Sequence, residues 1–209
     1  MSEWWTYHLS DFLLFSPRTY YRLIEQYNRD IWPLQLVAIG AGVLIFVLTL
    51  RGRGRVIITA LLAILCLFVA YAFHLRRYST INWAATWFAA AFAIEAILLL
   101  WMRPQKTSRL GLALFAFALL VQPFLGGRPL PQLEIFGIAP DPTVAATLGI
   151  LLFHRARWFL WIIPLLWCAI AGATLWAMHA PDALALPVVA VVALAFRLRT
   201  TSSQTRTLP

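Results

Sequence analysis

Residues 81–102 read INWAATWFAAAFAIEAILLLWM, and this stretch decides the fold class. It is apolar over most of its length and carries one carboxylate, Glu95. A helix needs about 20 consecutive apolar residues to cross a bilayer, and this stretch supplies them. We therefore predict a membrane-spanning helix with a carboxyl group inside the membrane.

Further apolar segments lie on both sides of that helix. Together they predict an all-α protein, a polytopic transmembrane helix bundle of about seven hydrophobic helices. The fifth and seventh segments are short, and the fifth would cover only about 16 Å as a helix. It is either a short span or a half-helix supported by its neighbours. In order, the segments are Ile31–Leu50, Val56–His74, Ile81–Met102, Leu110–Gly126, Thr143–Phe153, Trp158–His179 and Ala183–Phe196.

The overall composition agrees with a lipid environment. Hydrophobic residues make up 62% of the chain and charged residues only 12%. A soluble domain has about 25% charged residues, so this chain cannot build a water-soluble surface over its whole length. The formal charge of +9 comes from basic residues in short loops, which indicates membrane orientation and no nucleic-acid partner.

Basic residues in the loops predict the orientation. If all seven segments span, most Arg and Lys fall on one side of the membrane, which the positive-inside rule makes the cytoplasmic side. The N-terminus is then outside and the C-terminus inside. We expect the inner basic loops to contact anionic lipid head groups of the bilayer. The inner residues are Arg51, Arg53, Arg55, Arg103, Lys106, Arg109, Arg155, Arg157, Arg197, Arg199 and Arg206, and the outer ones are Arg18, Arg22, Arg29, Arg76, Arg77 and Arg128.

The chain divides into three parts. Residues 1–30 form an N-terminal amphipathic segment, residues 31–197 the helix bundle, and residues 198–209 a polar tail that we expect to be disordered. Within the first part, Ser16 and Pro17 predict a helix start. The helix that follows either lies in the membrane interface or packs on the bundle. Its apolar face is Tyr20, Leu23, Ile24 and Tyr27, and its polar face is Arg18, Arg22, Glu25, Gln26 and Arg29.

Two polar residues inside the apolar segments are candidates for function. Glu95 is the stronger one, because an intramembrane carboxylate is costly and suggests an ion or proton pathway. The alternative is a carboxyl group that only joins helices by hydrogen bonding. Gln122 precedes Pro123, which predicts either a cavity-facing amide or an ordinary kink with a local hydrogen bond.

The connection from Gly126 to Pro142 is long and rich in Pro and Gly. We expect Asp141 to cap the short helix after it, with Pro142 as the first helical residue. Thr143, Thr147 and His154 would complete a polar ligand pathway along that helix, near a helix N-terminus that favours anionic groups. Because the connection carries apolar residues, we expect it to fold over the outer face as a lid.

Metal and cofactor sites find little support. His74 and His179 end two spans at matched depth, but depth alone does not make a haem b site, and we predict no haem. Cys66 and Cys168 lie in apolar segments, where buried free thiols act as small hydrophobic groups. No metal motif and no catalytic constellation is present, so we predict neither a metal site nor catalytic residues.

Two stretches of the sequence carry a family resemblance. Residues 10–21 read SDFLLFSPRTYY and resemble the opening of an uncharacterised bacterial membrane-protein family, domain of unknown function 6064. Residues 136–143, FGIAPDPT, continuing to Thr147-Leu148-Gly149, are similar to the second recurrent motif of that family. In the family form a Cys often stands where this chain has Asp141. The resemblance implies a bacterial inner (plasma) membrane protein but no known activity.

These observations leave three hypotheses of function. The first is a transporter or channel for a small solute or ion, with or without proton coupling, whose polar site lies around Glu95 and the helix from Asp141 to His154. The second is a non-catalytic accessory or structural membrane subunit. The third is a membrane-embedded enzyme, which the short loops and the missing catalytic constellation disfavour.

Overall fold

The fold of the protein was analysed as a computed structural model, which describes residues 13–102, 108–153 and 157–205, with side chains up to residue 199. The described residues form helices and turns, and no strand occurs among them. The elements are α1 (Pro17–Asp30), α2 (Leu34–Leu50), α3 (Arg55–Phe68), η3 (Val69–Leu75), η4 (Tyr78–Thr80), α4 (Ala85–Leu100), α5 (Arg109–Leu120), η5 (Gln122–Phe124), η6 (Leu130–Gln132), α6 (Pro140–Leu151), α7 (Phe159–Ala177) and α8 (Ala185–Thr205).

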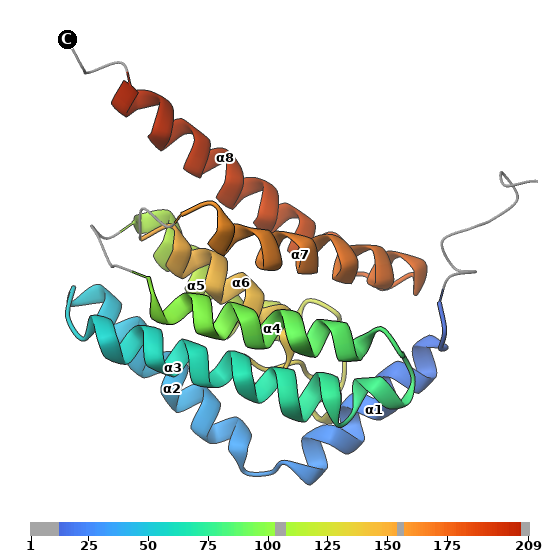
Figure 1. Ribbon diagram of the computed structural model, residues 1–209. Helices are drawn as coiled ribbons and strands as arrows, with labels where there is room; N and C mark the ends of the chain where they lie inside the picture. The colour runs from blue at the N-terminus through green and yellow to red at the C-terminus, as the bar shows by residue number, and fades with distance from the viewer. Residues whose placement is uncertain (1–12, 103–107, 154–156, 206–209) are drawn as a thin grey trace, which may run out of the picture.

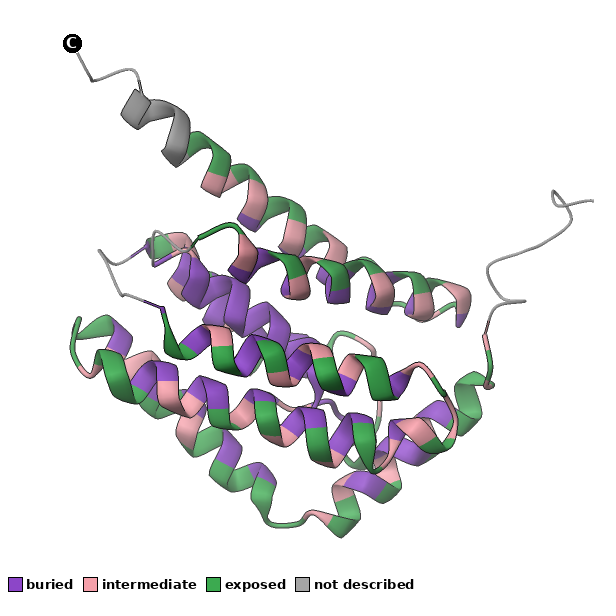
Figure 2. Ribbon diagram, viewed as in Figure 1, coloured by how far each residue is buried: buried purple, intermediate pink, exposed green. Residues whose placement is uncertain are grey.

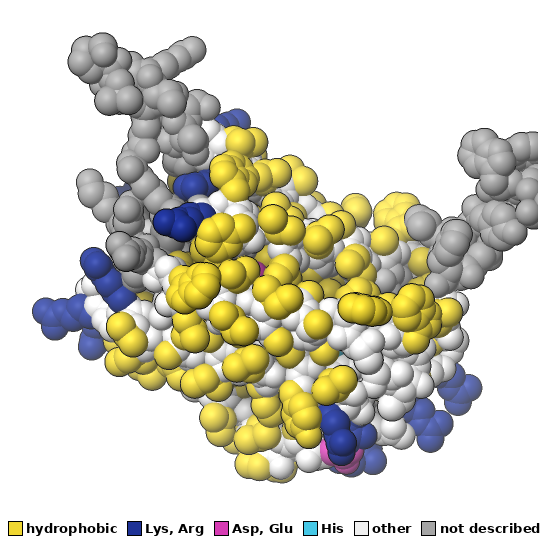
Figure 3. All heavy atoms as spheres, in the orientation of Figure 1, with side chains coloured by type: hydrophobic (Ala, Val, Ile, Leu, Met, Phe, Trp, Pro, Cys, Tyr) yellow, Lys and Arg dark blue, Asp and Glu magenta, His cyan; other side chains and the backbone are white. Residues whose placement is uncertain are grey.

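Successive helices run back and forth between two ends of the bundle (Figure 1). The α2–α3 turn, the start of α5, the start of α7 and the far end of α8 lie at one end, which we call the basic end. Its described basic residues are Arg51, Arg53, Arg55, Arg109, Arg157, Arg197 and Arg199. The opposite end, which we call the outer end, holds α1 and the connections that follow η3, α5 and α7. Figure 3 shows basic side chains gathered on both ends, with a mostly apolar surface between them.

Helix α6 is the centre of the fold. Every one of its 12 residues is buried, as Figure 2 shows by its uniform purple colour. The other long helices bury one face and expose the other, and the exposed faces carry large apolar side chains such as Val37, Ile64, Trp87 and Ile162. The bundle therefore has an apolar outside and a central helix that the surrounding helices cover.

Most predicted segments become helices, with three corrections of length. The third segment, predicted to span over Ile81–Met102, is shorter, because α4 covers only the 16 residues Ala85–Leu100. The seventh segment was predicted to be short, but α8 has 21 residues and continues through part of the predicted polar tail to Thr205. The fourth segment is shorter than predicted, because α5 ends at Leu120 and Gln122–Phe124 form a 3-10 turn. Pro123 cannot donate the backbone hydrogen bond that would continue the α-helix there.

By length and composition, two described helices are able to cross a membrane. They are the continuous helical stretch Arg55–Thr80 and the helix Phe159–Ala177. A third is added if α1 and α2, which meet at an angle of 88°, count as one bent pair. The apolar helices α4 and α5 are shorter.

Helix α1 has the cap and the two faces that its sequence predicts. The Ser16 side chain accepts a hydrogen bond from the Thr19 backbone N–H at 3.2 Å, and Pro17 is the first helical residue. The predicted apolar face, which is Tyr20, Leu23, Ile24 and Tyr27, is buried. Because the Tyr27 hydroxyl donates to the carbonyl of Ile138 at 2.9 Å, this face packs on the bundle.

Helices α5 and α6 cross at a pair of glycines. A Cβ atom on Gly111 would lie 2.5 Å from the carbonyl oxygen of Gly149, and one on Gly149 would lie 2.8 Å from the carbonyl oxygen of Gly111. Small residues let helix backbones approach closely in membrane proteins. These two glycines therefore set the distance between α5 and the central helix.

We expect Gly111→Ala to destabilise the protein, because its methyl group meets the α6 backbone, which cannot move aside as a flexible side chain can. Overpacking of this kind costs about 1–3 kcal/mol. Gly40→Ala in α2 is the matched control, since nothing lies within 4 Å of the place that its new methyl group would take. Thermal unfolding in detergent is the measurement. Equal melting temperatures for the two variants would contradict the crossing.

Candidate functional site

The candidate site follows the central helix α6. Its first turn carries Asp141 and Thr143, and its second carries Thr147 on the same side as Thr143. All three side chains are buried. Small and apolar residues fill the remaining positions of α6, which lets the surrounding helices close around it. The polar atoms of this helix therefore lie inside the bundle.

The two threonines are bonded to backbone groups. The Thr143 hydroxyl donates to the carbonyl of Ala139 at 2.6 Å and accepts from the N–H of Gly137 at 2.8 Å. The Thr147 hydroxyl donates to the carbonyl of Thr143 at 2.8 Å. Both residues lie on the predicted face, and their bonds close the N-terminal end of α6.

Asp141 is not the helix cap that its position predicted. Helix α6 begins at Pro140 with Ala139 as the N-cap residue, so Asp141 lies in the first turn. Pro140 fits the first helical position as well as Pro142 does, since both lack an N–H. The Asp141 carboxylate instead accepts a hydrogen bond from the indole N–H of Trp167 in α7 at 2.8 Å.

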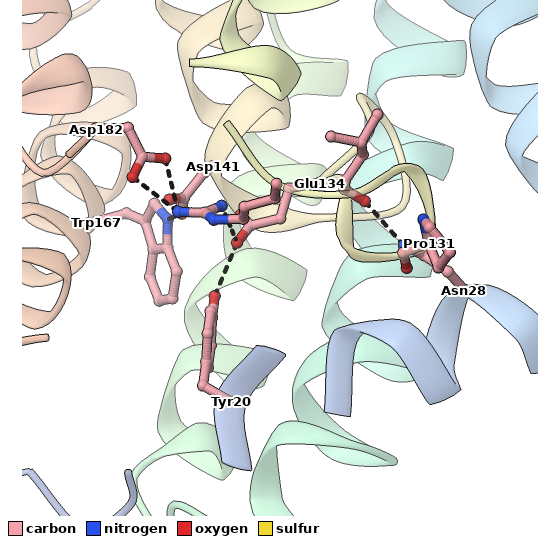
Figure 4. A network of polar contacts seen from close by, with 9 residues as sticks. Tyr20, Asn28, Pro131, Glu134, Asp141, Trp167 and Asp182 are labelled. Atoms are coloured by element: carbon pink, nitrogen blue, oxygen red, sulfur yellow. Dashed lines mark hydrogen bonds and ion pairs between the residues drawn. The ribbon is translucent and has the colours of Figure 1, made fainter. Parts of the chain in front are cut away.

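A buried ionic cluster lies beside Asp141 at the outer end (Figure 4). The guanidinium of Arg128 donates to both carboxylate oxygens of Asp182 at 2.7 Å. A second nitrogen of Arg128 lies 3.5 Å from Glu134, and its guanidinium stands over the ring of Tyr21 at 4.6 Å. One arginine therefore ties the connection between α5 and α6 to the turn before α8.

Electrostatics in this cluster depend on Arg128. Burial raises the pKa of Glu134, and Arg128 opposes that rise. The Tyr20 hydroxyl donates to Glu134 at 3.1 Å, and burial beside this carboxylate raises the pKa of Tyr20 well above its ordinary value. Tyr20 therefore stays a hydrogen-bond donor at neutral pH, and Glu134 holds its proton more readily than an exposed carboxyl group.

The connection before α6 folds over the outer end, as predicted. Leu133, Phe136 and Ile138 are buried, and Thr143 beneath them is fully buried. The Asn28 side chain of α1 donates to the carbonyls of Pro131 and Leu133, both at 2.9 Å. Helix α1 thus holds the connection in place. Leu130 departs from the expectation and is 75% exposed.

A small cavity reaches Asp141 from between α1, η3 and α7. Its volume is about 10 Å³, which is about the space that one water molecule needs. Two tyrosine side chains, Tyr20 and Tyr78, line it together with Asp141 and Trp167. On the side of the outer end, the buried Asp141 carboxylate therefore borders a cavity with space for about one water molecule.

Glu95 lies deep in the bundle. It is 3% exposed, and neither carboxylate oxygen has a hydrogen-bond partner among the described residues. Other parts of the protein therefore cover the Glu95 side chain. Gln122 is also buried, and its side-chain oxygen has no partner within the described part of the chain. His154 lies outside the described residues.

The two histidines considered for haem differ in environment. His74 is fully buried in the π-helical segment η3, whereas His179 is exposed and has a positive φ of 56°. Ring groups, including Phe92 and Trp167, pack around His74. Cys66 and Cys168 are buried and free. No group of three or more His, Cys, Asp or Glu suited to a metal ion is found in the described ranges.

Sequence reasoning missed the partners of Asp141. Trp167 reads as one apolar residue in an apolar span. Arg128 was counted only as a loop charge, and Asp182 was not singled out. Their separation in the sequence hides the cluster, since Arg128 and Asp182 are 54 residues apart. The one available signal was the pair of charges in Gly- and Pro-rich connections that both belong to the predicted outer side.

Fold and site together define an all-helical protein with an apolar outside and a buried polar interior around its central helix. The chain belongs to the family of unknown function DUF6064, whose sequence profile matches residues 18–207. No curated protein matches the chain. No solved structure matches it either.

We expect Arg128→Gln to destabilise the protein by about 3–5 kcal/mol, because it leaves the buried carboxylate of Glu134 and the partly buried carboxylate of Asp182 without their cation. The loss should grow with pH. An acid whose folded-state pKa is raised contributes full stability below its ordinary pKa, here 4.5, and loses stability as pH rises toward the folded value. Removing Arg128 raises that folded value further, so the decline becomes larger and reaches higher pH.

Unfolding in detergent between about pH 4 and pH 8 measures this effect. Arg22→Gln is the control, because Arg22 carries the same charge on the exposed face of α1. A pH dependence that is the same for both variants and the unmodified protein would rule out a structural role for the Arg128 cluster.

Proposed function

We propose that this protein is a multi-pass transporter or channel for a small solute or ion, with proton transfer at Glu95 as its coupling step. Seven helical segments, which are α2, α3 with η3, and α4 to α8, would cross the inner membrane of a bacterium. The alternation of these segments between two ends supports this topology (Figure 1). Surrounding protein would allow the 12-residue α6 to lie at membrane depth, since its backbone never meets lipid.

The observation that carries the proposal is the state of Glu95. Its two oxygens are buried without a partner among the described residues, in the middle of α4. A carboxylate placed there is costly, and intramembrane acids of this kind commonly serve ion or proton pathways. A group that only joined helices would be expected to have a donor, which the described surroundings of Glu95 do not supply.

The remaining polar residues support a path toward the outer end. Asp141 stands at the N-terminal end of α6, beside a cavity with room for one water molecule. Thr143 and Thr147 continue the polar face of that helix inward. Gln122 adds a buried amide oxygen without a partner in the described chain. These groups extend the polar interior beyond Glu95.

An accessory membrane subunit is the second candidate function. The observation that favours it is the local bonding of Thr143 and Thr147, whose hydroxyl groups already bond to backbone atoms. In that case the interior would hold the bundle together, and the exposed apolar faces would meet a partner as well as lipid. Loss of proton movement in the experiment on Glu95 distinguishes the two candidates.

The topology makes a direct prediction. Alkaline phosphatase fused after Arg53 or after Pro209 should be inactive, because both positions lie on the proposed cytoplasmic side. The same enzyme fused after Gly127 should be active, because it is exported to the outer side. Phosphatase activity in whole bacterial cells is the measurement. An active fusion after Pro209 would contradict the orientation.

We expect the purified protein in liposomes to move protons when a potassium diffusion potential is imposed, with an internal pH-sensitive dye as the readout. Glu95→Gln should reduce the initial rate at least about tenfold, since the amide cannot accept or release the proton. Glu25→Gln is the control, because it removes an acid from the polar face of α1. No proton flux from the unmodified protein, or equal flux from Glu95→Gln, would overturn the proposal.

A further inference from the structure

His74 is the most unusual buried group outside the ionic cluster and the polar face of α6. It is fully buried, and neither ring nitrogen has a hydrogen-bond partner among the described residues. A neutral imidazole carries one donor and one acceptor, and leaving a buried polar atom unbonded is costly. A position that needed only an aromatic side chain would be filled at lower cost by Phe.

The backbone around His74 is also unusual. Residues Val69–Leu75 form a π-helical continuation of α3, in which the N–H of Arg76 bonds to the carbonyl of Tyr71 at 3.0 Å. π-helical turns are rare and occur often at functional sites. The wider turn changes the direction of the side chains that follow it. His74, near its end, contacts residues of both α4 and α7.

Trp167 connects His74 to the outer end. Its indole N–H bonds to Asp141 at 2.8 Å, and its ring centre lies 4.9 Å from that of His74 in an edge-on arrangement. The small cavity beside Asp141 borders the same tryptophan. One indole ring therefore contacts both the carboxylate that reaches the cavity and the imidazole with free nitrogens.

Phe92 connects His74 to Glu95. Its ring centre lies 4.7 Å from that of His74. Glu95 follows one helical turn later on the same buried face of α4. His74 thus contacts two aromatic side chains: Trp167, which bonds to Asp141, and Phe92, which lies one turn before Glu95 on α4.

We infer that His74 carries protons between Asp141 and Glu95, an inference that rests on the proposed proton coupling at Glu95. His74 does not itself line the cavity. When the Trp167 indole moves aside, protonated Asp141 gives its proton, through a water molecule from the cavity, to one ring nitrogen of His74. The imidazolium then releases the proton on its other nitrogen to the Glu95 carboxylate. His74 returns to its neutral form as the other tautomer, so one proton has moved and no group is oxidised or reduced. Rotation of the ring restores the first tautomer.

Trp167 has a positioning role in this sequence. Its hydrogen bond holds the Asp141 carboxylate beside the cavity, and its ring separates that carboxylate from the imidazole. A small movement of the indole would let water reach from Asp141 to His74. Phe88, whose ring centre lies 5.9 Å from that of His74, belongs to the same aromatic cluster but has no polar atom to offer.

The liposome assay tests this inference on unmodified protein and on His74→Phe, His74→Gln and Phe88→Leu. Both His74 variants should lose at least about tenfold of the proton flux, because neither side chain accepts and releases a proton. His74→Phe keeps the aromatic packing, and His74→Gln keeps polar atoms without the larger ring. Phe88→Leu alters the same cluster and should keep the flux. Gel filtration and melting temperature establish that each variant is folded.

The results separate this inference from the function on which it rests. Flux that is lost in Glu95→Gln but kept in either folded His74 variant would overturn the relay and leave the role of Glu95 intact. No flux from the unmodified protein would overturn both. Flux lost in Phe88→Leu as well would indicate that packing of the aromatic cluster, and not the imidazole, is what matters, and would also overturn the relay.

Nitrogen NMR of protein labelled on histidine supplies a readout that does not depend on flux. Assigned by its absence in His74→Gln, the His74 signal should shift in both Asp141→Asn and Glu95→Gln, because each change alters one proton partner. Glu25→Gln should leave it unchanged. A His74 signal that is the same in all three variants would contradict exchange of protons with the two carboxyl groups.

Discussion

The complete burial of α6 is the constraint on which the rest of the structure depends. A helix with Asp141, Thr143 and Thr147 on it is stable in an apolar interior only if other protein groups cover it and meet its polar atoms. The glycine crossing brings α5 close to it, and Trp167 from α7 bonds to its first turn. The connection before α6 closes its N-terminal end and is itself held by α1. The helices that surround α6 thus supply the cover and the hydrogen-bond partners that its polar face requires.

Polar groups in the interior fall into two kinds. Some are paired: Arg128 meets Asp182 and Glu134, and Asp141 meets Trp167. Removing one member of such a pair leaves an uncompensated charge, so these contacts fix the geometry of the outer end. Others, among them the nitrogens of His74 and the oxygens of Glu95, have no partner in the described chain. Buried polar groups without a hydrogen bond add nothing to stability. The proposed exchange of protons would explain their presence.

The sequence predicted the helices well, because hydrophobic segment length and capping residues are local signals. The start of α1 at Ser16–Pro17 and its buried face of Tyr20, Leu23, Ile24 and Tyr27 are confirmed. The folding of the connection over Thr143 is also confirmed. The π-helical turn at His74 and the bond between Trp167 and Asp141 could not be predicted, since both depend on which helices meet in space. The same reason explains the error at Asp141, where two prolines offered equivalent helix starts and tertiary contacts selected the earlier one.

The position of the two unpaired groups relative to the paired cluster has a physical consequence. In the proposed pathway, a proton that enters from the outer end meets Glu134 and Asp141 first, where burial and neighbouring charges affect protonation, and only then reaches aromatic surroundings. Phe92 and Trp167 pack against His74, so a charge on the imidazole would have no polar neighbour among these rings. In the proposed relay, this aromatic packing limits where a proton can stay. The ionic cluster around Arg128 fixes the positions of the chain at the outer end. The aromatic cluster around His74 is apolar, so a charge there is costly and would be short-lived.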